Sequence, residues 1–123
     1  MSVTMGMLLA AMIQVESSGN NHAVGDEGRA IGCLQITRAV LADVNRAYRT
    51  EYILRDCYDR GKSVKICRNY LTLWGRKYED ETGTSATAQV LARIWNGGPR
   101  GWNKPETQAY WHKVKAELER MQA

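Results

Sequence analysis

The sequence predicts an α+β fold that is mainly α, with one small β-hairpin region near residues 22–34. Three observations lead to this fold class. Apolar residues recur at helical spacing in several segments, turn residues cluster between residues 20 and 36, and no repeat or linker interrupts the 123 residues. A chain of this length buries about two-thirds of its unfolded surface, so residues 1–123 are predicted to form a single domain.

The first helix is predicted to run from about Thr4 to Ser17. Apolar residues between Met5 and Val15 cover most of its circumference, which is typical of a central buried helix rather than a surface helix. Ser18 and Gly19 follow as helix-ending residues. The helix therefore carries Glu16 close to its C-terminal end.

The next segment predicts the only β-structure. Short runs at Ala23–Val24 and Ala30–Ile31 are expected to pair as a small irregular hairpin, with its turn at Asp26 to Gly28. Thr37 is then expected to cap a second helix over residues 38–48.

Three further helices are predicted, after a short helical turn within residues 51–59. A long one starts at Ser63, after Gly61, and ends near Thr82. Ser85 is expected to cap the next, which ends at residues 96–99. The last starts near Pro105, because proline is favoured at a first helical position. The residues predicted for its inner face are Tyr110, Trp111, Val114 and Leu118.

The charge and the aromatic residues limit the possible partners. The net charge is +4 and the sequence pI about 9.1, which suits an anionic polymer or serves solubility alone. Lys and Arg are spread from Arg29 to Arg120 without a compact stripe, so we expect no nucleic-acid binding. All aromatic residues are Tyr (6) or Trp (4), whose apolar faces and polar tips suit sugar rings. We expect a monomer.

No membrane segment or secretory signal is recognised. The apolar run Met5–Val15 is too short to span a bilayer and has no basic residues before it. The histidines, His22 and His112, are too sparse for a zinc site, and we expect no metal or cofactor. Of the cysteines, Cys33 is expected to be a buried thiol, whereas a bridge between Cys57 and Cys67 stays open.

Two carboxylates suggest a glycosidase active site. Such enzymes need one acid that stays protonated and a second that is ionised. Glu16 suits the first role, because the apolar helix and the negative helix C-terminus both favour the neutral carboxyl. Asp26, in a glycine-rich turn, suits the second. Glu16 can instead be an ordinary helix-terminal acid, and Asp26 a residue that stabilises its own turn. The adjacent Glu27 can also take the role of the second carboxylate in place of Asp26.

Two sets of motifs resemble the lysozyme-like superfamily. Glu16-Ser17, Gly25-Asp26 and Gly32-Cys33-Leu34-Gln35-Ile36 resemble goose-type lysozymes and bacterial lytic transglycosylases, although Thr37 stands where goose-type enzymes often carry a further Asp. Asn96-Gly97-Gly98-Pro99 and Tyr110-Trp111-His112-Lys113-Val114 are similar to invertebrate-type lysozymes. The dense disulfide set of the latter family is absent, which indicates a bacterial or phage relative.

The resemblance implies a lysozyme-like fold and a muramidase that cleaves the β-1,4 bonds of peptidoglycan, with Glu16 as general acid and chitin as a possible second substrate. It implies action at the cell wall, whether periplasmic, extracellular or phage-delivered. It also implies a set of substrate-binding residues: Gln35, Ile36, Thr37, Trp95, Asn96, Gly97 and Tyr110. Two alternatives stay open: a lytic transglycosylase that uses Glu16 alone, and a non-catalytic wall-binding module.

Overall fold

The computed structural model describes residues 2–123. It is 70% helical with one two-stranded antiparallel sheet, which confirms the α+β, mainly α fold class. The chain divides into two compact units, one comprising Ile13–Tyr70 and the other comprising the residues up to Met12 together with Leu71–Ala123. That residues 1–123 form a single domain stays a prediction.

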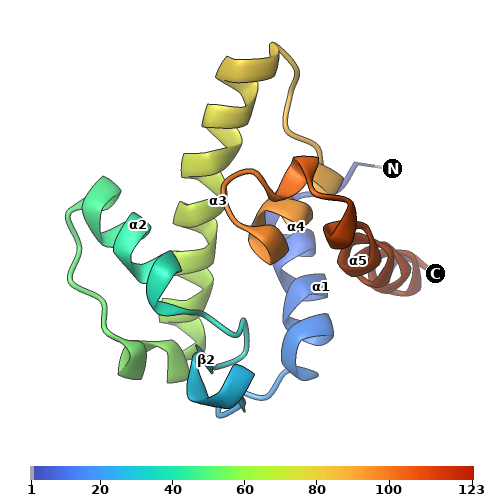
Figure 1. The fold of residues 1–123 in the computed structure, drawn as a ribbon. Helices are drawn as coiled ribbons and strands as arrows, with labels where there is room; N and C mark the ends of the chain where they lie inside the picture. The colour runs from blue at the N-terminus through green and yellow to red at the C-terminus, as the bar shows by residue number, and fades with distance from the viewer. Residues whose placement is uncertain (1) are drawn as a thin grey trace. The chain divides into compact units, whose positions relative to one another are not determined.

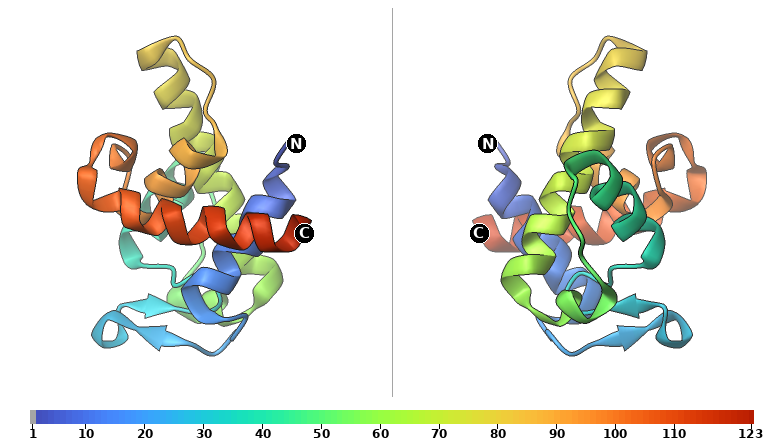
Figure 2. Two further views of the ribbon diagram at one scale, coloured as in Figure 1. Left: turned by 90° about the vertical axis from the view of Figure 1, so that its right-hand side faces the viewer. Right: turned by 90° about the vertical axis from the view of Figure 1, so that its left-hand side faces the viewer.

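The unit Ile13–Tyr70 contains the hairpin. After helix α1 (Met5–Ser17), strand β1 (Val24–Gly25), the 3-10 turn η1 (Asp26–Gly28) and strand β2 (Ala30–Ile31) follow. Val24 pairs with Ile31 and Gly25 with Ala30, and Figure 2 shows the strands as short arrows joined by the turn. Ile31 forms one further bridge, to Ile36. The predicted hairpin and its turn are therefore confirmed.

The rest of this unit is helical. It consists of α2 (Arg38–Tyr48), the 3-10 turn η2 (Leu54–Tyr58) and the first part of α3 (Arg60–Thr82) (Figure 1). Val40, Leu41 and Val44 form the buried face of α2, as their spacing of one, three and four residues predicts. Thr37 occupies the N-cap position, but its side chain makes no capping hydrogen bond.

The second unit contains the later helices. Helix α4 (Ala88–Gly97), the 3-10 turns η3 (Gly101–Asn103) and η4 (Pro105–Thr107) and helix α5 (Gln108–Gln122) follow one another. Helix α4 packs against both η3 and α5. Tyr110, Val114 and Leu118 form the buried face of α5, which confirms most of the inner face predicted for the last helix.

Two predicted helix starts are wrong. Helix α3 begins at Arg60, before Gly61 and Ser63, because the Asp59 side chain accepts a hydrogen bond from the backbone N–H of Lys62 at 2.9 Å. The buried Ser63 hydroxyl donates instead to the Cys57 carbonyl at 2.7 Å.

The cap of α4 is also not the predicted one. Thr87, two residues after Ser85, is the N-cap, and its side-chain oxygen accepts from the Val90 N–H at 3.2 Å. Gly83 has a φ of 69°, as expected for a glycine that follows a helix. Within residues 2–123, no helix has the length and apolar character needed to cross a membrane.

Candidate active site

Glu16 lies in the last turn of α1 and is partly buried. The helix stops directly after it, because Ser18 (φ 53°) and Gly19 (φ 83°) adopt left-handed backbone conformations. The Arg60 guanidinium donates to the Gly19 carbonyl at 2.5 Å and so fixes the path of the chain as it leaves the helix. The end of α1 that carries Glu16 is thus held from outside the helix.

Ser17 links this helix end to the second part of the motif. Its hydroxyl lies 2.8 Å from the Cys33 carbonyl and 3.2 Å from the Ile13 carbonyl, and it can donate to either. The shorter contact spans sixteen residues, from the residue after Glu16 to the loop that contains Gly32 and Gln35. The two motif segments are therefore neighbours in space.

Gly32 allows this loop to pack against η2. Its φ is +84°, and a Cβ atom built there would lie 1.8 Å from the Cys57 carbonyl oxygen. No side chain fits in that space, so the glycine is a steric requirement. The same Cys57 carbonyl accepts the Ser63 hydroxyl, which fixes the position of the backbone against which Gly32 lies.

Gln35 crosslinks the hairpin. Its side-chain amide donates to the Gly32 carbonyl at 3.0 Å and the Ala23 carbonyl at 3.3 Å. Its side-chain oxygen would lie 2.2 Å from a Cβ atom on Gly25, so a larger residue there would displace the Gln35 amide from its present position. Gln35 is partly buried, and its side-chain N–H groups donate to carbonyls of the hairpin. Only the exposed part of its side chain is therefore open to a ligand.

Ile36, which the sequence predicts to bind substrate, lies in the core beneath the hairpin. Its side chain is fully buried, and its backbone N–H and carbonyl pair with those of Ile31 at 2.9 and 3.0 Å. The backbone N–H of Ile36 is used in the bridge, and its side chain has no polar group. We therefore assign Ile36 to the hydrophobic core beneath the hairpin.

Asp26 lies at the tip of the hairpin, where its side chain is 60% exposed. Asp26 and Glu27 both have positive φ angles, 49° and 56°, which turns the chain tightly at this point. The Arg29 guanidinium lies 3.3 Å from the Asp26 carboxylate and also donates to its backbone carbonyl at 3.2 Å. Glu27 is 88% exposed, and its nearest carboxylate oxygen lies farther away, at 3.9 Å from the Arg29 guanidinium. Asp26 is the better fixed of the two acids.

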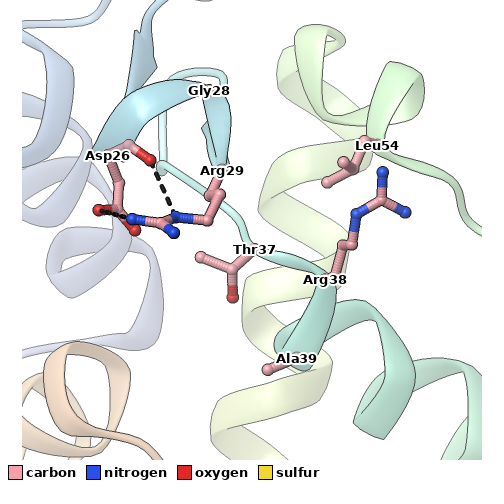
Figure 3. Close-up of a pocket in the computed structure, with 7 residues that line it drawn as sticks. All are labelled: Asp26, Gly28, Arg29, Thr37, Arg38, Ala39 and Leu54. Carbon is pink, nitrogen blue, oxygen red and sulfur yellow. Dashed lines mark hydrogen bonds and ion pairs between the residues drawn. The ribbon is translucent and has the colours of Figure 1, made fainter.

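A cavity of about 350 Å³ opens beside Asp26. Figure 3 shows Thr37 between the two basic side chains of the cavity, with Arg29 turned toward Asp26 and Arg38 toward Leu54. Among the described residues, Arg38 has no ion-pair partner. The structure thus brings Asp26 and Thr37 to one cavity, whose charge is net positive with two guanidinium groups and one carboxylate.

The other predicted substrate-binding residues lie in the second unit, on α4 and α5. Trp95 is buried in α4, Asn96 is exposed near its end, and Gly97 is its last residue. A Cβ atom on Gly97 would lie 2.5 Å from a methyl carbon of Thr107, so the glycine lets η4 approach the helix end. Tyr110 is buried on α5.

The buried Thr107 organises the chain around Asn96 and Gly97. Its hydroxyl accepts from the Arg93 guanidinium at 2.8 Å and lies 2.8 Å from both the Gly101 and Lys104 carbonyls. Lys104 also donates through its ammonium to the Gly97 carbonyl at 2.7 Å. This network fixes the loop after α4, so Asn96 is presented on a defined backbone.

The cysteines are all free and fully buried: Cys33, Cys57 and Cys67. The bridge between Cys57 and Cys67 that the sequence left open is therefore absent. Burial raises the pKa of the Cys57 thiol to about 12. Burial also raises the pKa of the Cys67 thiol well above its ordinary value, and the nearby Glu16 carboxylate raises it further. Glu16 and the buried Cys67 thiol thus influence each other electrostatically.

Comparison with known proteins identifies the family. The sequence-family model described as the transglycosylase SLT domain matches residues 3–117 of the chain. The chain belongs to the transglycosylase SLT domain family. This membership confirms the resemblance to the lysozyme-like superfamily that the motifs indicate.

Molluscan lysozymes are relatives of this SLT-family chain. It is 33% identical to a lysozyme of Ostrea edulis over 91 residues, which are 72% of the chain and 62% of that protein. It is 39% identical to a lysozyme of Magallana gigas over 66 residues, 48% of each, and 35% identical to lysozyme 1 of Crassostrea virginica over 69 residues, 50% of the chain and 38% of that protein. The chain thus spans about half the length of these relatives.

Several residues around the candidate positions have no role in the sequence-based prediction. In the unit Ile13–Tyr70, Ser17 and Arg29 bond to the candidate segments and Arg38 lines the cavity beside Asp26. In the second unit, Arg93 and Thr107 hold the chain after α4. Ser17 stands beside Glu16 in the motif, and Thr107 stands three residues before Tyr110, so their places in the sequence are a signal. Their partners, however, lie fourteen or more residues away for Ser17 and Arg93, and spacing alone does not reveal such contacts.

Proposed function

We propose that the chain is a peptidoglycan hydrolase, a muramidase that cleaves the β-1,4 bond between N-acetylmuramic acid and N-acetylglucosamine at the cell wall. The observation that carries the proposal is the position of Glu16. Its carboxyl is partly buried at a helix end that Ser17 ties to the Gly32–Ile36 loop. The relatives named lysozyme support a hydrolase, and the transglycosylase SLT family supports an enzyme that acts on the cell wall.

In this proposal Glu16 is the general acid. It donates its proton to the glycosidic oxygen as the bond from that oxygen to the anomeric carbon breaks, and positive charge develops on the sugar ring. Asp26 is the second carboxylate, which stabilises this charge and assists the water that completes hydrolysis. The water's hydroxyl ends on the anomeric carbon, and its proton is taken up by a carboxylate.

A lytic transglycosylase that uses Glu16 alone is the second candidate. The observation that favours it is the environment of Asp26, which is exposed and paired with Arg29. The Arg29 guanidinium donates a hydrogen bond to this carboxylate at 3.3 Å, and an oxygen engaged in this way is less available to orient a water molecule. In this alternative the 6-hydroxyl of the muramic acid closes on the anomeric carbon, and no water is consumed.

The products distinguish the two reactions. Purified peptidoglycan is digested with the protein, and the masses of the released muropeptides are measured by mass spectrometry. Reducing muramic acid ends support hydrolysis, whereas 1,6-anhydro ends, each lighter by one water, support transglycosylation. No clearing of a cell-wall suspension by the wild-type chain, with binding retained, supports a non-catalytic wall-binding module instead.

Three variants test the carboxylates separately. Glu16→Gln is expected to lose at least about 10²-fold in rate, because a general acid contributes roughly 10²–10⁴-fold. Asp26→Asn is expected to lose a similar factor in a hydrolase and little in a transglycosylase. Glu27→Gln is the matched control, an adjacent exposed acid that should stay active. Activity retained by Glu16→Gln contradicts the proposal, and loss in Glu27→Gln with Asp26→Asn active reassigns the second acid.

A further inference from the structure

The second unit contains a cavity that the proposed catalytic groups do not explain. It has a volume of about 270 Å³ and lies between the second half of α3 and the loop after α4. Three aromatic side chains line it: Trp74 and Tyr78 from α3 and Trp102 from η3. All three are half-buried, so part of each ring is open to a ligand.

The aromatic wall is fixed before any ligand arrives. The rings of Tyr78 and Trp102 meet edge to face, with centroids 4.9 Å apart and planes at 76°. The Arg100 guanidinium lies 5.3 Å from the centre of the Trp102 ring, and Arg100 is itself held by Glu81 at 2.8 Å. Because these side chains are already ordered, a ligand loses little of its affinity to ordering them.

The charge of the cavity comes from one side chain. The hydrogen bond from Arg100 holds the pKa of Glu81 below its usual range, so this pair is ionised and neutral as a whole. Lys77, one turn before Glu81 on the same helix, also lines the cavity and has no ion-pair partner among the described residues. Lys77 also acts on Glu81, whose pKa it lowers further. The cavity therefore presents aromatic rings and a net positive charge, with two cations and one carboxylate.

We infer that this cavity is an accessory glycan-binding site for a single N-acetylated hexopyranose that carries a carboxylate. A pyranose offers C–H faces to an aromatic ring and hydroxyl edges to its polar tips. Pockets for drug-sized ligands measure roughly 300–1,000 Å³, so 270 Å³ suits one ring better than a chain. One ammonium matches one carboxylate rather than the phosphates of a nucleotide.

The inference goes beyond the proposed function, on which it rests only for the choice of sugar. The probes are therefore monosaccharides, which contain no bond for the enzyme to cleave. N-acetylmuramic acid, N-acetylglucosamine and adenosine monophosphate are titrated at millimolar concentration and low salt. The indole N–H signals of the four tryptophans are followed by NMR and assigned with single Trp→Phe variants.

The expected result is a shift of the Trp74 and Trp102 signals, with N-acetylmuramic acid bound about two- to fivefold more tightly than N-acetylglucosamine, as an exposed charge pair allows. Lys77→Met should abolish this preference and leave N-acetylglucosamine binding unchanged. Lys115→Met, an exposed lysine of α5 outside the cavity, is the matched control and should keep the preference.

Three results overturn the inference. They are shifts confined to Trp95 or Trp111, a preference that survives Lys77→Met, and tighter binding of the nucleotide than of either sugar. The variant Glu16→Gln should bind the sugars like the wild type. Failure of the proposed catalysis and failure of this site are thus separate outcomes.

Discussion

Replacing Gly32 by Ala tests how the candidate catalytic loop is held. Gly32 has a φ of +84°, and the added Cβ atom would lie 1.8 Å from the carbonyl oxygen of Cys57 and 2.9 Å from its carbon. Both atoms belong to the backbone of η2, and the buried Ser63 hydroxyl holds that carbonyl at 2.7 Å. The clash therefore cannot be relieved by a side-chain rotation, so the loop between Ala23 and Gln35 has to move.

Two terms give the size of the effect. A left-handed conformation costs a residue with a Cβ atom roughly 1–2 kcal/mol, and overpacking typically costs about 1–3 kcal/mol. Gly32→Ala is therefore expected to lose about 2–5 kcal/mol of unfolding free energy, a large part of the roughly 5–15 kcal/mol of a typical domain. Since the loop is tied to Ser17, wall-clearing activity should fall as well.

Gly28→Ala is the matched control for this experiment. Gly28 has nearly the same φ, +88°, but no atom lies within 4 Å of its added Cβ, so it reports the left-handed cost alone. Urea unfolding followed by circular dichroism measures both variants, and Gly32→Ala should lose about 1–3 kcal/mol more than Gly28→Ala. Equal losses in the two variants would refute the steric argument.

Three other outcomes follow from local contacts. Thr87→Ala should destabilise the protein by about 1 kcal/mol through loss of the α4 cap, whereas Ser85→Ala should not; equal Tm values for the two would contradict the cap. The Ile53 N–H bond to Asp56 lowers the pKa of that carboxyl, so the stability lost in Asp56→Asn should be present above the ordinary pKa of 3.8 and should vanish as the pH falls through the lower folded value. If the wild type stays more stable than Asp56→Asn at a pH below the folded pKa of Asp56, this explanation is wrong. The three free, buried thiols should resist iodoacetamide at neutral pH and react completely in urea, and adducts counted by mass spectrometry check this; rapid labelling of the folded chain would contradict their burial.

Helix positions show where sequence reasoning succeeds. The spacing of Val40, Leu41 and Val44 predicted the buried face of α2, and the turn residues around Asp26 predicted the hairpin. Both signals are local, because side-chain periodicity and backbone freedom act within a few residues. The same local rules misplaced two helix starts, at Ser63 and at Ser85, since a nearby Asp or Thr formed the cap instead.

The candidate site also has features that the sequence predicts and features that only the structure shows. The motif residues Glu16 and Asp26 can be picked out from the sequence, because their types and neighbours fit acid catalysis. Their environments could not be predicted: the Arg29 partner of Asp26 and the electrostatic effect of Glu16 on the buried Cys67 thiol appear only in the structure. The burial of Ile36 could not be predicted either, since a motif position does not reveal whether its side chain faces solvent.

The sequence by itself determined the family, the mainly helical fold class and the order of the helices, because motif identity and apolar periodicity are written along the chain. Only the tertiary structure decided that the three cysteines stay unbridged, that Gln35 crosslinks the hairpin, and that an aromatic cavity forms around Trp102. These features depend on contacts between segments distant in the chain. Such contacts form when the helices and loops pack together, and they produce no repeating pattern of residues along the sequence.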